Sequence, residues 1–168
     1  MTEHILTQDE LKRQLHYNQD TGIFTRLVSI ANCKILVGDI AGCLKYTGYI
    51  CIKFKSKPYQ AHRLAWLYMT GLWPKHQIDH INGIKNDNRW CNLREATTFE
   101  NNRNCRKRKD NTSGHKGVSF DKLKCRWIAY ARSNNKKVHL GTFDTVEMAS
   151  NAYKIFAQEN YGDFFREA

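Results

Sequence analysis

The first half of the chain alternates between short strand-like and helix-like patterns. Residues 48–55 (GYICIKFK) alternate apolar and polar side chains, as a half-buried strand does, and residues 59–62 begin a partner strand after a turn. Residues 63–70 carry apolar side chains on one helical face, and Gly71 follows them as a signal for the end of a helix. The other expected elements are a helix opened by the capping box at residues 7–10 with Leu11 and Leu15 on one face, a turn at residues 18–22, a strand from Gly22, and loops over residues 32–46.

The middle of the chain, residues 78–101 (IDHINGIKNDNRWCNLREATTFEN), predicts two short extended segments, a loop and a helix. Thr97 and Glu100 have the spacing of a helix capping box, so a helix should begin directly after Thr97. The dipeptide Asp79-His80 precedes an Asn-Gly turn. Neighbouring side chains of a regular strand point to opposite faces, so this pair can share a site only where its strand ends or is distorted.

The last third of the chain predicts a small module of three strands and one helix. Strands are expected at residues 116–120, 126–132 and 138–143, with a hairpin turn at residues 134–137. A capping box at residues 144–147 opens a helix with one continuous apolar stripe. The stripe consists of Ala149, Ala152, Tyr153, Phe156 and Ala157. The whole chain is therefore expected to have an α+β fold, with a three-stranded antiparallel sheet and one helix at its C-terminal end.

Composition divides the chain into three parts. Residues 1–105 form the first domain, in which the front section supports the unit at residues 78–101, because that unit alone is too small for a core. Residues 106–114 are basic and polar and lack apolar side chains, so they are expected to form a linker. Residues 115–168 form the second domain.

Positive charge is concentrated in one stretch of the 168 residues. The net charge is +11, and residues 102–139 hold twelve Lys or Arg and two Asp, which gives this stretch +10. A solvated surface would mix the two signs, so the stretch indicates DNA binding. No apolar run is long enough to span a membrane, and the N-terminal residues lack the order of a signal peptide, so a cytoplasmic protein that is not secreted is expected. The six cysteines contain no C-x-x-C pair, which argues against a structural zinc site.

Four polar residues of the middle stretch resemble the HNH nuclease motif, in the branch found in phage and intron-encoded homing endonucleases. These are Asp79, His80, Asn92 and Asn101, and the surrounding matches are His62-Arg63, Trp66 and Asp87-Asn88-Arg89. The resemblance implies a ββα-metal fold and a homing-type endonuclease that hydrolyses double-stranded DNA. It also implies one divalent metal per active site and no small-molecule cofactor.

The chemistry gives each of these residue types a role. A neutral imidazole can accept a proton from water near pH 7, so His80 is the candidate general base. The oxygens of Asp79 and Asn101 are hard ligands that suit Mg²⁺ or Mn²⁺, and such a metal neutralises the phosphate and helps the leaving oxygen depart. Asn92 completes the catalytic set by orienting His80 or bracing the loop. His62 is expected to be a hydrogen-bonded histidine beneath the site rather than part of it.

The last third resembles an AP2 domain, a DNA-binding module best known from plant transcription factors. The matching residues are Gly117-Val118, Trp127, Ala129, Leu140-Gly141-Thr142-Phe143, Glu147, Ala149, Ala152-Tyr153 and Gly162. In that family the sheet lies in the major groove and outward-facing side chains contact DNA. The candidates for DNA contact are Arg103, Arg106, Lys107, Arg108, Lys109, Lys116, Lys122, Lys124, Arg126, Trp127, Arg132, Lys136 and Lys137. Alternation puts Trp127 on the face opposite Arg126 and Arg132, so helix packing and DNA contact both stay open for Trp127.

Two other functions stay open at the level of sequence. A DNA-binding regulator with an inactive HNH site would keep the second domain and lose the chemistry, although the intact motif argues against it. A less specific phage nuclease would cut DNA of random sequence. One active site per chain predicts a nick unless two copies cooperate.

Overall fold

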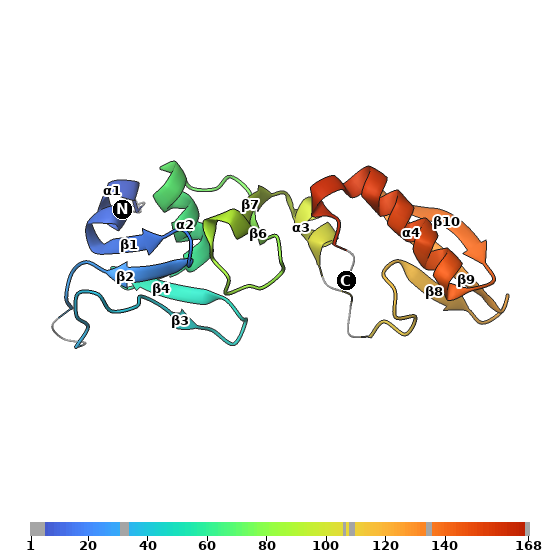
Figure 1. Cartoon of the computed structure of the whole chain (residues 1–168), viewed down its shortest axis with the longest axis horizontal. Coiled ribbons are helices and arrows are strands. Elements are labelled where there is room, and N and C mark those ends of the chain that lie inside the picture. The colour runs from blue at the N-terminus through green and yellow to red at the C-terminus, as the bar shows by residue number, and fades with distance from the viewer. Residues whose placement is uncertain (1–5, 31–33, 106, 108–109, 134–135, 167–168) are drawn as a thin grey trace. The chain divides into compact units, whose positions relative to one another are not determined.

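The chain forms two compact units, residues 1–98 and residues 99–168. The structure is a computed structural model that describes residues 6–30, 34–105, 107, 110–133 and 136–166. No helix among these residues is long and apolar enough to cross a membrane. Figure 1 labels most of the helices and strands of both units.

The first unit combines helices with three small antiparallel sheets. Its elements are α1 (Gln8–Gln14), β1 (Leu15–Asn18), β2 (Ile23–Arg26), β3 (Cys43–Leu44), β4 (Ile50–Phe54), β5 (Lys57–Gln60), α2 (Ala61–Thr70), β6 (Gln77–His80), the 3-10 turn Trp90–Asn92 and β7 (Leu93–Ala96). Strands β1 and β2 form one hairpin, β3, β4 and β5 form a three-stranded sheet, and β6 pairs with β7. The mixture of helices and antiparallel sheets confirms the expected α+β class.

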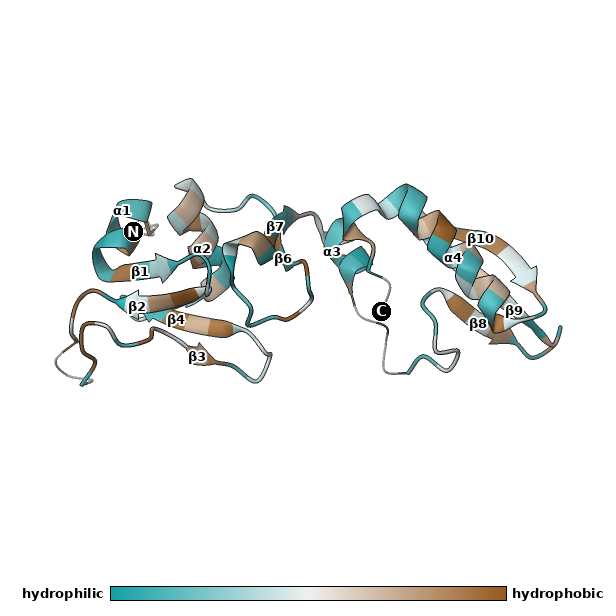
Figure 2. Ribbon diagram, in the orientation of Figure 1, coloured by the Kyte–Doolittle hydropathy of each residue, from teal (hydrophilic) through white to brown (hydrophobic). Residues whose placement is uncertain are grey.

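One apolar cluster holds the first unit together. Leu11 of α1, Phe24 of β2, Ile52 of β4 and Leu64 of α2 are each no more than 2% exposed. Figure 2 shows the apolar residues along β2 and β4 that contribute to this cluster. Burial of such side chains contributes roughly 1.5–3 kcal/mol each. The front section therefore supplies the core that β6 and β7 lack by themselves.

The start of the first helix is as predicted, but its end is not. The Thr7 hydroxyl accepts from the Glu10 N–H, and the Glu10 carboxylate accepts from the Thr7 N–H, which confirms the capping box. Leu15, predicted on the helical face with Leu11, instead begins β1 and pairs with Arg26. The predicted turn at residues 18–22 folds this hairpin back, so cross-strand pairing prevails over continuation of the helix.

The second predicted strand and the following helix are also displaced. Strand β5 spans Lys57–Gln60 rather than residues 59–62, and helix α2 begins at Ala61. His62 therefore lies on a helix, where it is buried. Gly71 ends α2 in a left-handed conformation, as predicted.

The second unit is a three-stranded antiparallel sheet with one helix packed along it. Its elements are α3 (Thr98–Asn104), which begins at the boundary between the units, β8 (Val118–Asp121), β9 (Arg126–Ser133), β10 (Lys136–Phe143), α4 (Val146–Tyr161) and the 3-10 turn Gly162–Phe164. The strand order is β10-β9-β8. Val118, Ala129 and Ala149 are buried between the sheet and α4, and the small alanines let the helix approach closely. Figure 2 shows the alternation of hydrophilic and hydrophobic residues along α4 that an amphipathic helix requires.

Helix α4 begins one residue later than predicted. Its N-cap is Thr145, whose hydroxyl accepts from the Met148 N–H, so residues 144–147 do not form the expected capping box. The predicted hairpin turn at residues 134–137 lies partly outside the described residues, and β10 already begins at Lys136. Helix α3 begins directly after Thr97, where the sequence placed its N-cap.

Candidate functional site

Asp79 and His80 are both buried at the end of strand β6. Their exposed fractions are 5% and 4%, and His80 is the last residue of the strand. The chain turns there, since the His80 carbonyl accepts from the Gly83 N–H at 2.7 Å. The strand therefore ends at His80. This is the condition under which Asp79 and His80 can share a site.

The Asp79 carboxylate is held by an arginine on the neighbouring strand. Arg94 lies opposite Asp79 in the β6–β7 pair. Its Nε and Nη2 atoms donate to Oδ2 of Asp79 at 2.9 and 2.8 Å. A buried carboxylate requires such a charge partner, so β7 contributes to the site as directly as β6 does.

The His80 imidazole is packed among polar and aromatic groups of the first unit. Its Nε2 atom lies 3.2 Å from Oδ1 of Asn88, and an amide oxygen as acceptor puts the hydrogen on Nε2 and the lone pair on Nδ1. The rings of His62 and Tyr49 lie at centroid distances of 5.0 and 6.0 Å. Burial lowers the pKa of His80, although the hydrogen bond that His80 donates to Asn88 and the charge of Asp79 oppose that shift. The geometry thus favours a neutral imidazole.

His62 differs from the prediction made for it. Its ring packs edge-on against His80 within the first unit, and burial, followed by the charges of His80 and Arg63, lowers its pKa to about 3. Its Nδ1 atom is buried and has no hydrogen-bond partner among the described residues, so the expected hydrogen-bonded histidine is wrong in that respect. A neutral ring against His80 adds no charge to the site.

Asn92 braces the loop between β6 and β7. Its Oδ1 accepts from the Asn82 N–H at 2.9 Å, and its Nδ2 donates to the Asp87 carbonyl at 2.7 Å. Asp87 in turn accepts from Asn82 and Arg89, and the bond from Arg89 holds the pKa of Asp87 at about 2. Of the two roles predicted for Asn92, these bonds correspond to bracing the loop that carries Asn88.

The candidate metal ligands lie in different units. Asp79 is in the first unit, whereas Asn101 lies on α3 in the second, and their joint role stays a prediction. Among the described residues no group of three or more His, Cys, Asp or Glu side chains could hold a metal ion. That finding is compatible with Mg²⁺, which usually keeps several waters and takes one or two carboxylates together with substrate phosphates. The oxygens of Asp79 and Asn101 are each of the hard type that Mg²⁺ prefers.

The sheet of the second unit presents a polar face away from α4. Trp127 packs against Phe120 and the cluster beneath α4, whereas Arg126 and Arg132 lie exposed on the other side of β9. The strand register puts on this face the side chains of Ser119, Asp121, Arg126, Ile128, Tyr130, Arg132, Lys137, His139 and Thr142. The sequence candidates omitted Tyr130 and His139, although strict alternation along β9 and β10 would have found them.

Lys137 and Tyr130 give this polar face its local structure. The Lys137 ammonium lies 3.5 Å from the centroid of the Tyr130 ring, and the His139 ring lies 5.3 Å from it on the other strand. Arg126 is also paired with Asp144 at 2.8 Å. A planar ring with a lysine ammonium over its face suits contact with a phosphate backbone and its bases.

The remaining candidates for DNA contact are spread over the second unit. Lys122 and Lys124 are exposed in the β8–β9 hairpin, and the guanidinium of Arg103 on α3 lies 4.6 Å from the Tyr161 ring. Lys107 and Lys116 lie near α4 rather than on the polar face of the sheet. Arg106, Arg108 and Lys109 lie outside the described residues.

Gly22 is the residue that lets the hairpin β1–β2 approach the Asn88 loop. Its φ is +73°, and a Cβ there would lie 2.4 Å from the carbonyl carbon of Asn88. We expect Gly22→Ala to lower the free energy of unfolding by about 2–4 kcal/mol, from backbone strain and from a clash with rigid backbone. Urea unfolding measures the effect.

The matched control for this prediction is Gly38→Ala. Gly38 also has a positive φ, +92°, but nothing lies within 4 Å of a Cβ built on it. The control should lose only the strain contribution of about 1 kcal/mol. Equal losses in the two variants would show that close approach to Asn88 does not stabilise the first unit.

Comparison with known proteins finds two families, one after the other along the chain. Residues 59–103 match the HNH endonuclease family, and residues 113–163 match the AP2 domain. "Protein 3.8" of Escherichia phage T7 is 32% identical over 111 residues, which cover 66% of this chain and 91% of that protein. No solved structure matches the chain. The chain therefore belongs to the HNH endonuclease family, and an AP2 domain follows its HNH segment.

Proposed function

We propose that the protein is a metal-dependent DNA endonuclease in which His80 is the general base. The observation that carries the proposal is the buried imidazole of His80 beside Asp79, held by Asn88 and kept neutral by burial. A neutral imidazole accepts a proton from the attacking water, whereas an imidazolium has no free nitrogen lone pair and cannot act as a base. Asn88 and Asn92 keep the ring and its loop in place.

Asp79 and Asn101 would hold one divalent metal, Mg²⁺ or Mn²⁺. When bound, the metal supplies charge neutralisation at the phosphate and stabilises the leaving oxygen. Arg94 orients the Asp79 carboxylate through two hydrogen bonds to Oδ2. The protein's own contribution is therefore a fixed carboxylate and a neutral base on adjacent residues of one strand end.

The second unit would position this site on double-stranded DNA. The exposed face with Arg126, Arg132 and Lys137 is proposed to enter the major groove, where arginines can read guanine edges. The basic residues at positions 103–109 would follow the phosphate backbone. By resemblance, the target is one preferred site, as in homing endonucleases.

Cleavage of supercoiled plasmid DNA tests the function. Relaxed circles or linear DNA should form with Mg²⁺ or Mn²⁺ and not with EDTA. Salt-sensitive binding without cleavage, on plasmid and on the DNA of the source genome alike, would favour the DNA-binding regulator. Equal cleavage of random-sequence and source DNA would favour the less specific nuclease.

DNA binding should depend steeply on salt, and the polar face of the sheet should account for part of that dependence. Arg132→Ala and Lys137→Ala should each lower the slope of log K against log salt by about 1, because each removes one phosphate contact. Fluorescence anisotropy over a range of salt concentrations measures the slope. The control Lys53→Ala removes an exposed lysine of β4. An unchanged slope in both face variants would exclude this face from phosphate contact.

A further inference from the structure

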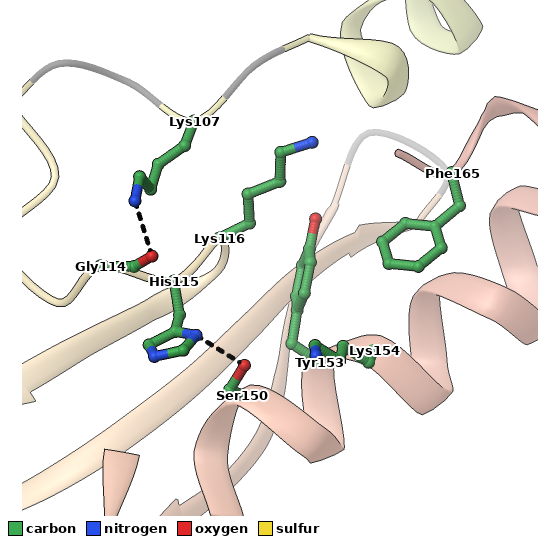
Figure 3. A pocket seen from close by; sticks show the side chains of 8 residues that line it. All are labelled: Lys107, Gly114, His115, Lys116, Ser150, Tyr153, Lys154 and Phe165. Carbon is green, nitrogen blue, oxygen red and sulfur yellow. Dashed lines mark hydrogen bonds between the residues drawn. The ribbon is translucent and has the colours of Figure 1, made fainter. Parts of the chain in front are cut away.

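A cavity of about 280 Å³ lies on the helix side of the second unit, away from the polar face of the sheet. Figure 3 shows its walls, which come from the segment before β8, from α4 and from the chain after α4. The lining residues are Lys107, Gly114, His115, Lys116, Ser150, Tyr153, Lys154 and Phe165. Cations and aromatic rings thus surround a space that the proposed DNA-binding face does not use.

The wall from the segment before β8 is fixed by its own hydrogen bonds. The Ser113 hydroxyl lies 2.9 Å from the Val118 carbonyl and donates within this segment. The Asn111 side chain accepts from the Gly114 N–H through Oδ1 and donates to the His115 carbonyl through Nδ2. Nδ1 of His115 lies 2.9 Å from the Ser150 hydroxyl of α4, as Figure 3 shows. The loop is therefore tied both to the sheet and to the helix before any ligand arrives.

The aromatic wall is fixed as well. A Cβ at Gly117 would lie 2.2 Å from the Tyr153 ring, so only glycine allows the ring to lie against the backbone there. Tyr153 and Phe165 meet edge to face with a centroid distance of 6.5 Å. Burial raises the pKa of Tyr153 to about 12, so its hydroxyl remains a hydrogen-bond donor at neutral pH. A ligand would meet preformed walls, which reduces the entropy lost on binding.

Lys116 of the cavity wall lies close to Arg166, and among the described residues neither has an acidic side chain as a salt-bridge partner. The Lys116 ammonium donates to the carbonyl of Arg166 at 2.6 Å, and burial together with the Arg166 charge lowers the pKa of Lys116. Nη1 of Arg166 is buried and has no hydrogen-bond partner among the described residues. Like charges held together at reduced solvation are unfavourable, and a bound anion would remove both costs.

We propose that this cavity binds the phosphate group of a nucleotide, with Lys116, Arg166 and Lys107 around the phosphate and the nucleotide's ring against Tyr153 and Phe165. A phosphate offers several oxygens to converging cations, and aromatic side chains stack on any base. The nucleotide is either free or part of a DNA strand. The inference does not rest on the nuclease chemistry, because it uses none of the residues of the HNH site.

The experiment uses the whole ¹⁵N-labelled chain in EDTA, so that DNA remains uncut. Amide shifts of residues 115–117 and 150–154 are followed while inorganic phosphate, dTMP or a short 5′-hydroxyl oligothymidylate is added. Saturable shifts are expected with dTMP, and weaker binding with inorganic phosphate, which lacks the ring. Lys116→Met and Arg166→Gln should weaken binding by about tenfold each, as loss of a charge-assisted bond does.

The matched control is Lys53→Met, which removes an exposed lysine of β4 in the first unit and should bind as the wild type does. Shifts with dTMP alone would identify a free nucleotide, and shifts with the oligothymidylate would identify a strand. The proposal is overturned if neither gives saturable shifts at these amides, or if chloride at equal ionic strength gives the same shifts. Wild-type affinity in both Lys116→Met and Arg166→Gln would also overturn it, and Arg166→Gln alone decides the matter if Lys116→Met does not fold.

Discussion

Replacing His80 with alanine should reduce DNA cleavage by about 10²–10⁴-fold, the usual contribution of a general base. The reason is that His80 is the buried neutral imidazole next to Asp79, and its ring is already oriented by Asn88. Binding to DNA should be unchanged, because the proposed contacts lie in the second unit. Nicking of supercoiled plasmid with enzyme in excess measures the chemical step, and anisotropy measures binding in EDTA.

The matched control is His16→Ala, since His16 is an exposed histidine on β1. It should cleave at the wild-type rate and unfold at the same urea concentration. Retention of cleavage by His80→Ala would remove His80 from the mechanism, while the family assignment would stand. Loss of cleavage in both variants would indicate damage to the fold rather than loss of a base.

The sequence predicted the framework of this site because its signals are local. The strand end at His80 followed from the Asn-Gly turn, and the start of α3 followed from Thr97 and Glu100. These features depend on residues within four positions of one another, where backbone geometry and capping dominate. The joint role of Asp79 and Asn101 still rests on resemblance.

The partners of Asp79 and His80 could not be predicted in the same way. Arg94 reaches Asp79 through strand register, and His62 reaches His80 because α2 buries it against the end of β6. Asn88 was among the residues that match the HNH motif, yet no local sequence feature indicated that its amide would face the imidazole of His80. Such contacts depend on tertiary packing, which periodicity does not encode.

In the second unit too, local patterns could be predicted from the sequence and tertiary packing could not. Alternation along β9 separated Trp127 from Arg126 and Arg132, but only the packing of α4 shows which side is covered. The irregularity between His139 and Gly141 shifts the register of β10. Beyond His139, strict alternation of side chains therefore no longer predicts which face of the sheet a residue of β10 lies on. The polar face is therefore defined by the helix and the bulge together.

Arg94→Met should lower the free energy of unfolding by about 3–5 kcal/mol, because breaking a buried ion pair leaves a charge that burial penalises. The side chains of Arg94 and Asp79 are 17% and 5% exposed. The control Arg89→Met breaks a pair with Asp87 whose arginine is 48% exposed, so a much smaller loss is expected there, because solvent screens an exposed pair. The double variant Asp79→Asn/Arg94→Met should recover most of the loss, since it removes both charges. Equal losses in Arg94→Met and Arg89→Met would contradict a special role for the buried pair.

The same variant tests whether Asp79 is a metal ligand without measuring activity. A cation bound at Asp79 would replace part of the charge that Arg94 supplied, so Mn²⁺ should raise the melting temperature of Arg94→Met more than that of the wild type. Asp79→Asn/Arg94→Met should lose this response, because the carboxylate is gone. A Mn²⁺ response equal in Arg94→Met and the double variant would place the metal elsewhere. In that case Arg94 would serve only to neutralise a buried carboxylate, and His80 would need a different source of help at the phosphate.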